Sequence, residues 1–181
     1  LQKERLSAYH IGFVLGPCIN ASGRLHTAKR ALELLNTEDK ALAIERAQAL
    51  KAMNDERKTL TEKGVEAAVE QIESSSLKED RVLVVYLPDC HESLAGIIAG
   101  RIRERYYRPV FVLTDGEEAV KGSGRSIETY SMFEEMSKCK ELFIKYGGHP
   151  MAAGLSIPKE LLDTFRQQLN TMCQLTKEEL T

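Results

Sequence analysis

The sequence has no tryptophan, and all aromatic residues together make up only 6% of its 181 residues. It also lacks an excess of either charge, because 25 basic and 27 acidic side chains leave a formal net charge of −2. A basic surface over the whole chain is therefore excluded, and any nucleic-acid binding has to come from a local site. The hydrophobic fraction of 43% is ordinary for a globular protein of one domain with additional elements.

Cysteines are few and widely separated, at Cys18, Cys90, Cys139 and Cys173. Without a C-x-x-C pair they argue against a zinc ribbon and a disulfide framework, and free thiols in a reducing cytoplasm are the simple interpretation. No signal peptide and no run of about eighteen apolar residues is present, so no export or membrane span is predicted. Since the sequence begins at Leu1 without Met, we expect a piece of a longer protein.

A long helical pattern occupies the first half of the chain. The stretch GPCINASGRL at 16–25 is rich in glycine and small polar residues and predicts a loop, and 26–36 has helical spacing. From an expected N-cap at Thr37, apolar residues recur every three or four positions to about Glu73 without a proline. Such a helix spans roughly 50 Å, which suits a connection between two bodies.

The second half alternates between strand and helix patterns, which predicts an α/β domain from about 76 to 173. Continuous apolar runs predict buried strands, and amphipathic stretches predict helices. A further segment from 117 begins as a strand and is expected to end in a glycine-rich turn. Expected strands lie at 81–87, 109–114 and 154–157, and expected helices at 92–106, 131–143 and 158–172.

The stretch GSGRS at 122–126 contains the parts of a phosphate site. Gly122 and Gly124 would open the backbone so that N–H groups converge on an anion, and Ser123 and Ser126 add hydroxyl donors. Arg125 adds a planar charged fork that fits phosphate oxygens. The competing interpretation is a glycine-rich turn with an exposed arginine. The motif taken alone favours this second interpretation.

Two histidines lie in similar surroundings. His91 precedes a helix that Ser93 or Asp89 could cap, and a surface role and a binding role are about equally supported. His149 lies in GGHPMAAG, where small neighbours leave room around the ring, so we favour a ligand contact. A metal role is not expected, because no His/Asp cluster has metal-ligand spacing. Farther upstream, Asn20 and Arg24 are polar donors in the expected loop.

Four segments in this order resemble the RecJ family of single-strand-specific exonucleases, which belongs to the DHH phosphoesterases. They are GPCINASGRL, CHESLAGIIAGRI, GSGRS and GGHPMAAGL. The resemblance implies that 1–36 is the tail of a DHH catalytic domain, 37–75 a connector helix, and 76–173 a mixed-sheet DHHA1 domain that holds substrate. Residues 174–181 would begin a following linker.

The resemblance also implies the chemistry. The parent enzyme would degrade single-stranded DNA from 5′ to 3′ with Mn²⁺ or Mg²⁺ bound in the DHH domain, so this chain would have neither a metal nor nuclease activity by itself. Ser123 and Arg125 would hold the 5′ phosphate, with Gly124 and Ser126 beside them. The cleft would also be lined by Gly147, Gly148, His149, His91, Asn20 and Arg24.

This chain departs from the family pattern at two places. Cys18 stands where the family usually has arginine, which removes a cationic contact. Cys90, Glu92 and Ser93 replace the usual tryptophan, proline and glycine around His91, and an acidic Glu92 is unfavourable beside a phosphate. The alternatives are an oligoribonuclease or cyclic-dinucleotide phosphodiesterase of the same superfamily, or a non-catalytic nucleic-acid-binding module.

Overall fold

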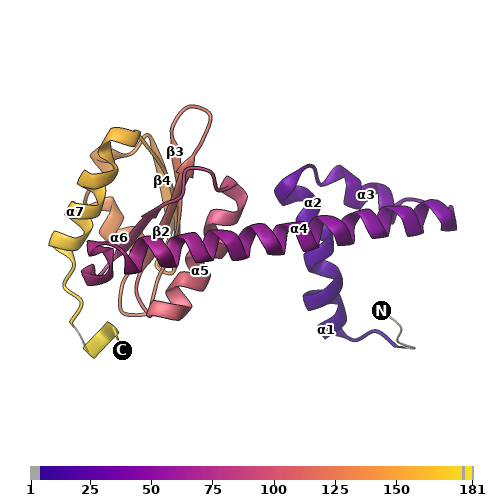
Figure 1. The fold of residues 1–181 in the computed structure, drawn as a ribbon, viewed down its shortest axis with the longest axis horizontal. Helices are drawn as coiled ribbons and strands as arrows, with labels where there is room; N and C mark the ends of the chain where they lie inside the picture. Colours follow the sequence, from indigo (N-terminus) through magenta and orange to yellow (C-terminus); the bar gives the residue numbers. More distant parts are fainter. Residues whose placement is uncertain (1–4, 177, 181) are drawn as a thin grey trace. The chain divides into compact units, whose positions relative to one another are not determined.

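The computed structural model describes residues 5–176 and 178–180. The chain divides into two compact units, Leu1–Leu60 and Thr61–Thr181, and the division falls within one long helix. The first unit is helical, and the second is a five-stranded mixed sheet with helices on both faces (Figure 1). The predicted fold class, an α/β domain preceded by a long helix and a small helical part, is confirmed.

The N-terminal unit shows that the predicted loop at 16–25 is wrong. Helix α1 (Ala8–His10) runs through a π-helical turn (Ile11–Leu15) into α2 (Gly16–Leu25), and α3 (Lys29–Leu35) follows. Proline is tolerated in the first turn of α2, where its missing N–H would have no helical partner. Ala21 and Ser22 are fully buried in this helix, so tertiary packing outweighs the weak helix propensity of its glycines and small polar residues.

The long helix α4 (Lys40–Glu73) is continuous over 34 residues, as predicted. Its N-cap is Asp39 rather than Thr37, because the Asp39 Oδ1 accepts the N–H groups of Ala41 at 2.8 Å and Leu42 at 3.0 Å. The C-terminal part of α4 belongs to the second unit, where Ala68 and Ile72 are fully buried.

The sheet has the strand order β1-β2-β3-β5-β4. The two buried apolar runs form β1 and β2, which pair in parallel, and every other pairing is antiparallel. GSGRS, expected as a glycine-rich turn at the end of a strand, lies mainly within a strand, and KYGGH also forms a strand. The strands are β1 (Leu83–Tyr86), β2 (Val110–Asp115), β3 (Val120–Arg125), β4 (Lys145–His149) and β5 (Ala152–Ile157).

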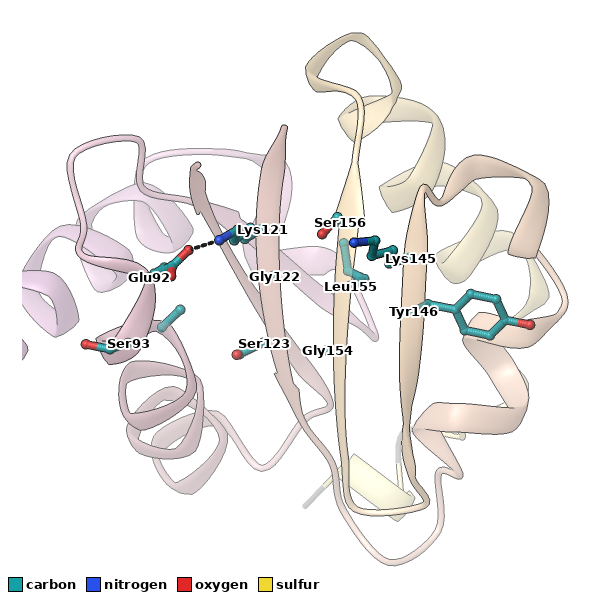
Figure 2. Close-up of a pocket in the computed structure, with 11 residues that line it drawn as sticks. Glu92, Ser93, Lys121, Gly122, Ser123, Lys145, Tyr146, Gly154, Leu155 and Ser156 are labelled. Carbon is teal, nitrogen blue, oxygen red and sulfur yellow. Dashed lines mark ion pairs between the residues drawn. The ribbon is translucent and has the colours of Figure 1, made fainter. Parts of the chain in front are cut away.

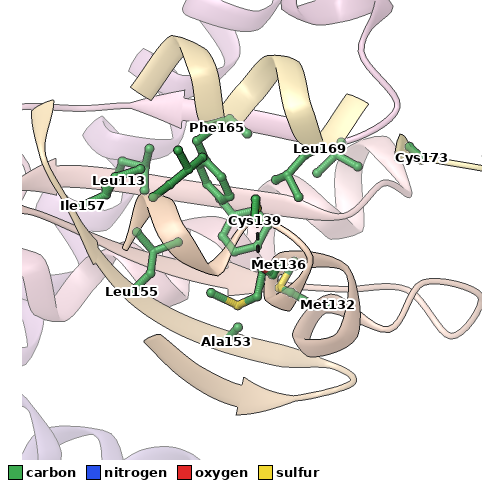
Figure 3. Packing of buried hydrophobic residues seen from close by; sticks show 14 of the residues in the cluster. Leu113, Met132, Met136, Cys139, Ala153, Leu155, Ile157, Phe165, Leu169 and Cys173 are labelled. Carbon is green, nitrogen blue, oxygen red and sulfur yellow. Dashed lines mark hydrogen bonds between the residues drawn. The ribbon is translucent and has the colours of Figure 1, made fainter. Parts of the chain in front are cut away.

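One face of the sheet is closed by α6 (Met132–Ser137) and α7 (Leu162–Met172), which pack a core against β2, β3 and β5 (Figure 3). On the other face, α5 (Glu92–Tyr106) and the end of α4 cover β1 and β2. Beyond α5, residues of β4 and β5 that point to this face are exposed or half-buried. The sheet therefore has one fully packed face and one partly open face.

Gly122 and Gly124 point into the packed face. A Cβ on Gly122 would overlap Leu113, and one on Gly124 would overlap the Met132 sulfur and lie 2.8 Å from the Phe111 ring. These glycines make room for core side chains brought in from other elements, so their presence in β3 is explained without an anion.

We predict that Gly124→Ala lowers the free energy of unfolding by about 1–3 kcal/mol, because the added methyl overpacks the core. Gly147→Ala is the matched control on β4, where an added Cβ would meet nothing within 4 Å. Urea unfolding followed by circular dichroism measures both, and the control should stay within about 0.5 kcal/mol of the unmodified chain. Equal midpoints for the two variants would contradict this packing.

Candidate functional site

The partly open face is formed by nine residues in three rows across β3, β5 and β4. In antiparallel pairing, residues directly opposite each other point to the same face. The register therefore places on one face the rows Lys121–Ser156–Lys145, Ser123–Gly154–Gly147 and Arg125–Ala152–His149. We call these nine residues the open face. Its corners are three cations and a histidine, and its other positions are small.

A depression of about 410 Å³ lies over two of these rows (Figure 2). Its floor includes Ser123 and Gly154, and its sides include Lys121 and Lys145. The first turn of α5 closes one end through Glu92, Ser93 and Ala95. A floor of serine and glycine lets a ligand approach the backbone closely, and lysines at the sides favour an anion.

Arg125 and His149 lie in the same row, because each is directly opposite Ala152. Their backbones are two strand spacings apart, about 10 Å. The Arg125 guanidinium lies against α5, where a Cβ on Gly96 would come within 2.7 Å of Nη2. Its Nη1 donates to the Gly124 carbonyl at 2.7 Å. Glycine at position 96 thus leaves the space that this guanidinium occupies.

Lys121 and Lys145 were missed by the sequence analysis. Lys121 forms an ion pair with Glu92 at 2.5 Å, and the Glu92 carboxylate raises the pKa of Lys121 (Figure 2). Lys145 is exposed, and its side chain extends over β5 toward Ser156. The available signal was the two-residue period of a strand, since Lys121 precedes Arg125, and Lys145 precedes His149, by four positions.

His91 is itself the N-cap of α5, a role that the sequence analysis had offered to Ser93 or Asp89. Its Nδ1 accepts the Ser93 N–H at 3.2 Å and lies 2.8 Å from the Ser93 hydroxyl oxygen. Ser93 in turn lines the depression. His91 is therefore beside the site, exposed, and held in place by its capping role.

Three of the expected site residues point away from the open face. Ser126 is fully buried, and its hydroxyl donates to the Tyr130 carbonyl at 2.6 Å. Gly124 faces the core, as described above. Gly148 is exposed, but a Cβ there would overlap the Ala152 carbonyl oxygen and lie 2.6 Å from the Ala153 Cα, so the backbone of β5 leaves no room for a side chain. These contacts do not support a phosphate role for Gly124 and Ser126 or a place for Gly148 in the lining of the cleft.

Asn20 and Arg24 lie in the N-terminal unit, on α2. Both are exposed, and their spacing of four residues places them on one side of that helix. Their expected contact with the DNA substrate stays a prediction.

The described residues, 5–176 and 178–180, contain no group of three or more His, Cys, Asp and Glu side chains that could hold a metal ion. The four cysteines are free, and burial raises the pKa of the Cys139 thiol to about 11, which disfavours a reactive thiolate. In the same part of the chain, no helix has the length and apolar character needed to cross a membrane.

The family model of the DHHA1 domain matches residues 79–175, so the chain belongs to the DHHA1 domain family. The single-stranded-DNA-specific exonucleases RecJ of Bacillus subtilis and Salmonella typhimurium are each 36% identical to it, over 171 and 178 residues. These matches cover 93% of this chain but 22% and 31% of the relatives. The chain thus corresponds to the DHHA1 region of the RecJ family.

Solved structures agree with this assignment. The crystal structure of RecJ from Thermus thermophilus in complex with Mg²⁺ matches with a TM-score of 0.80 and 33% identity. The match covers 91% of this chain and 26% of that one. A structure of the same protein in complex with Mn²⁺ matches with the same TM-score. The chain spans about a fifth to a third of the curated relatives it matches.

We predict that the two serines of GSGRS behave differently. Ser126→Ala should lower the free energy of unfolding by about 1–3 kcal/mol, because it leaves the buried Tyr130 carbonyl without its donor. Ser123→Ala, on the open face, should change it by less than about 0.5 kcal/mol. Urea unfolding of both variants checks this, and a larger loss for Ser123→Ala would refute the assignment.

Proposed function

We propose that this chain is the part that holds the DNA substrate in a RecJ-type exonuclease, which degrades single-stranded DNA from 5′ to 3′. The observation that carries the proposal is the open face, where cationic side chains surround a floor of glycine, alanine and serine. The similarity to exonucleases whose names specify single-stranded DNA supports this substrate class.

Arg125 is the group best suited to a terminal phosphate. Its guanidinium presents a planar set of N–H donors, and charge-assisted bonds from such a fork to phosphate are among the stronger hydrogen bonds in proteins. The Ser123 hydroxyl, two residues earlier on the same strand and face, adds a donor. His149, across Ala152 from Arg125, can donate a hydrogen bond or stack on a base.

Hydrolysis itself is assigned to a part of the parent enzyme outside the described residues. The RecJ structures contain Mg²⁺ or Mn²⁺, whereas the described part of this chain has no suitable ligand group. In the proposal those ions are held by an Asp/His-rich DHH domain, in the cytoplasm, and this chain positions the strand. We accordingly expect it to bind DNA without degrading it.

The proposal predicts that the 181-residue chain binds 5′-phosphorylated single strands more tightly than 5′-hydroxyl strands. Binding should weaken steeply with salt, because it depends on phosphate contacts, and should be weak overall at a net charge of −2. Arg125→Ala should abolish the preference for the phosphorylated end. Fluorescence anisotropy with labelled oligothymidylates at several salt concentrations measures both effects.

Lys138→Ala is the control variant, because it removes one positive charge from the layer of helices on the packed face. It should leave the end preference unchanged. Equal binding of both strand ends by the unmodified chain would contradict the role of Arg125, and an equal effect of both variants would reduce that role to net charge.

A further inference from the structure

The row Lys121–Ser156–Lys145 is separate from the row that contains Arg125. Lys121 and Lys145 are each directly opposite Ser156, so two lysines flank one serine on this face, with the Lys121 ammonium turned toward Glu92 (Figure 2). Lys121 precedes Arg125 by four positions, or about 13 Å along β3.

Helix α5 contacts these two cationic groups at two different positions along its length. The Lys121 ammonium meets Glu92 at the first position of α5, and the Arg125 guanidinium lies against Gly96, about one turn later. The open face therefore presents positive charge at two places along β3, with the small row between them. A single phosphate at Arg125 leaves the lysine row unused.

Glu92 changes the charge of the lysine row. Its carboxylate pairs with Lys121, so Lys121, Lys145 and Glu92 together carry one net positive charge instead of two. Glu117 and Glu118, which precede β3, also raise the pKa of Lys121, so that it stays protonated. The pair is half-exposed on both sides, and such pairs exchange partners at little cost.

We propose that Lys121, Ser156 and Lys145 form a second phosphate subsite, and that Glu92 competes with the bound phosphate for Lys121. This inference rests on the proposed function, because the second phosphate is an internucleotide phosphate of the strand whose 5′ end lies at Arg125. Glu92 lowers the affinity of the subsite in two ways: it occupies Lys121 in the free protein, and it repels the phosphate once displaced. Strands long enough to reach the lysines gain affinity over a mononucleotide.

The role of Glu92 is tested by Glu92→Gln, with Glu135→Gln as the matched control. Glu135 pairs with Lys138 at 2.6 Å on α6, so the control removes the same charge from a similar pair on the packed side of the sheet. Glu92→Gln should tighten binding of a 5′-phosphorylated oligothymidylate by about two- to five-fold. The slope of log K against log salt should steepen by up to about 0.7, because one more cation becomes available. Unchanged or weaker binding, or an equal gain in the control, would overturn the competition.

The subsite itself is tested by comparing dTMP with a 5′-phosphorylated thymidine trinucleotide in NMR titrations, which measure weak binding. Lys145→Gln and Lys121→Gln should weaken binding of the trinucleotide several-fold and leave dTMP unchanged. Arg125→Ala should weaken binding of both. Thermal unfolding monitored by circular dichroism verifies that these substitutions preserve the fold.

The two proposals fail in different ways. If the unmodified chain binds neither ligand, the proposed function fails, and the second subsite fails with it. If binding depends on Arg125 but the lysine variants bind the trinucleotide with the affinity of the unmodified chain, the second subsite is overturned and the proposed function stands.

Discussion

The alternation of side chains across β3, β5 and β4 is the constraint on which the rest of this structure depends. One set of residues has to fill the core beneath α6 and α7, which explains the glycines at 122 and 124 beside Phe111 and Met132. The other set points to a face that α5 covers only in part. Core packing thus fixes the register, and the register brings Arg125, His149 and the two lysines to one surface.

Helix α5 does more than cover part of the sheet. Its first turn closes one end of the depression, and Glu92 there neutralises one of the two lysines. One turn later, Gly96 leaves room for the guanidinium of Arg125. The same helix therefore makes room for the Arg125 guanidinium and neutralises the Lys121 ammonium. The positive charge of the open face is uneven for this reason, although both outer rows end in cationic or ionisable side chains.

Much of the fold could be predicted from local pattern. The helix expected at 92–106 occupies those residues, the buried strands β1 and β2 follow their apolar runs, and α4 is continuous. The errors concern segments whose glycines suggested turns or loops. In α2 and β3 these residues are explained by burial or by side chains distant in sequence, such as Met132, which no local pattern reveals. Of the open face, the sequence analysis named Ser123, Arg125, Gly147 and His149, whereas the placement of Lys121 and Lys145 on the same face follows from the pairing of three strands.

The central claim is that single-stranded DNA binds on the open face of the sheet. Amide chemical-shift mapping of the 181-residue chain with a 5′-phosphorylated oligothymidylate tests it most directly. The account predicts that the largest changes in amide chemical shift occur at Ser123, Gly147 and Gly154, while the amide signals of α7 do not change. Shifts concentrated on α6 and α7 with an unperturbed open face would contradict it.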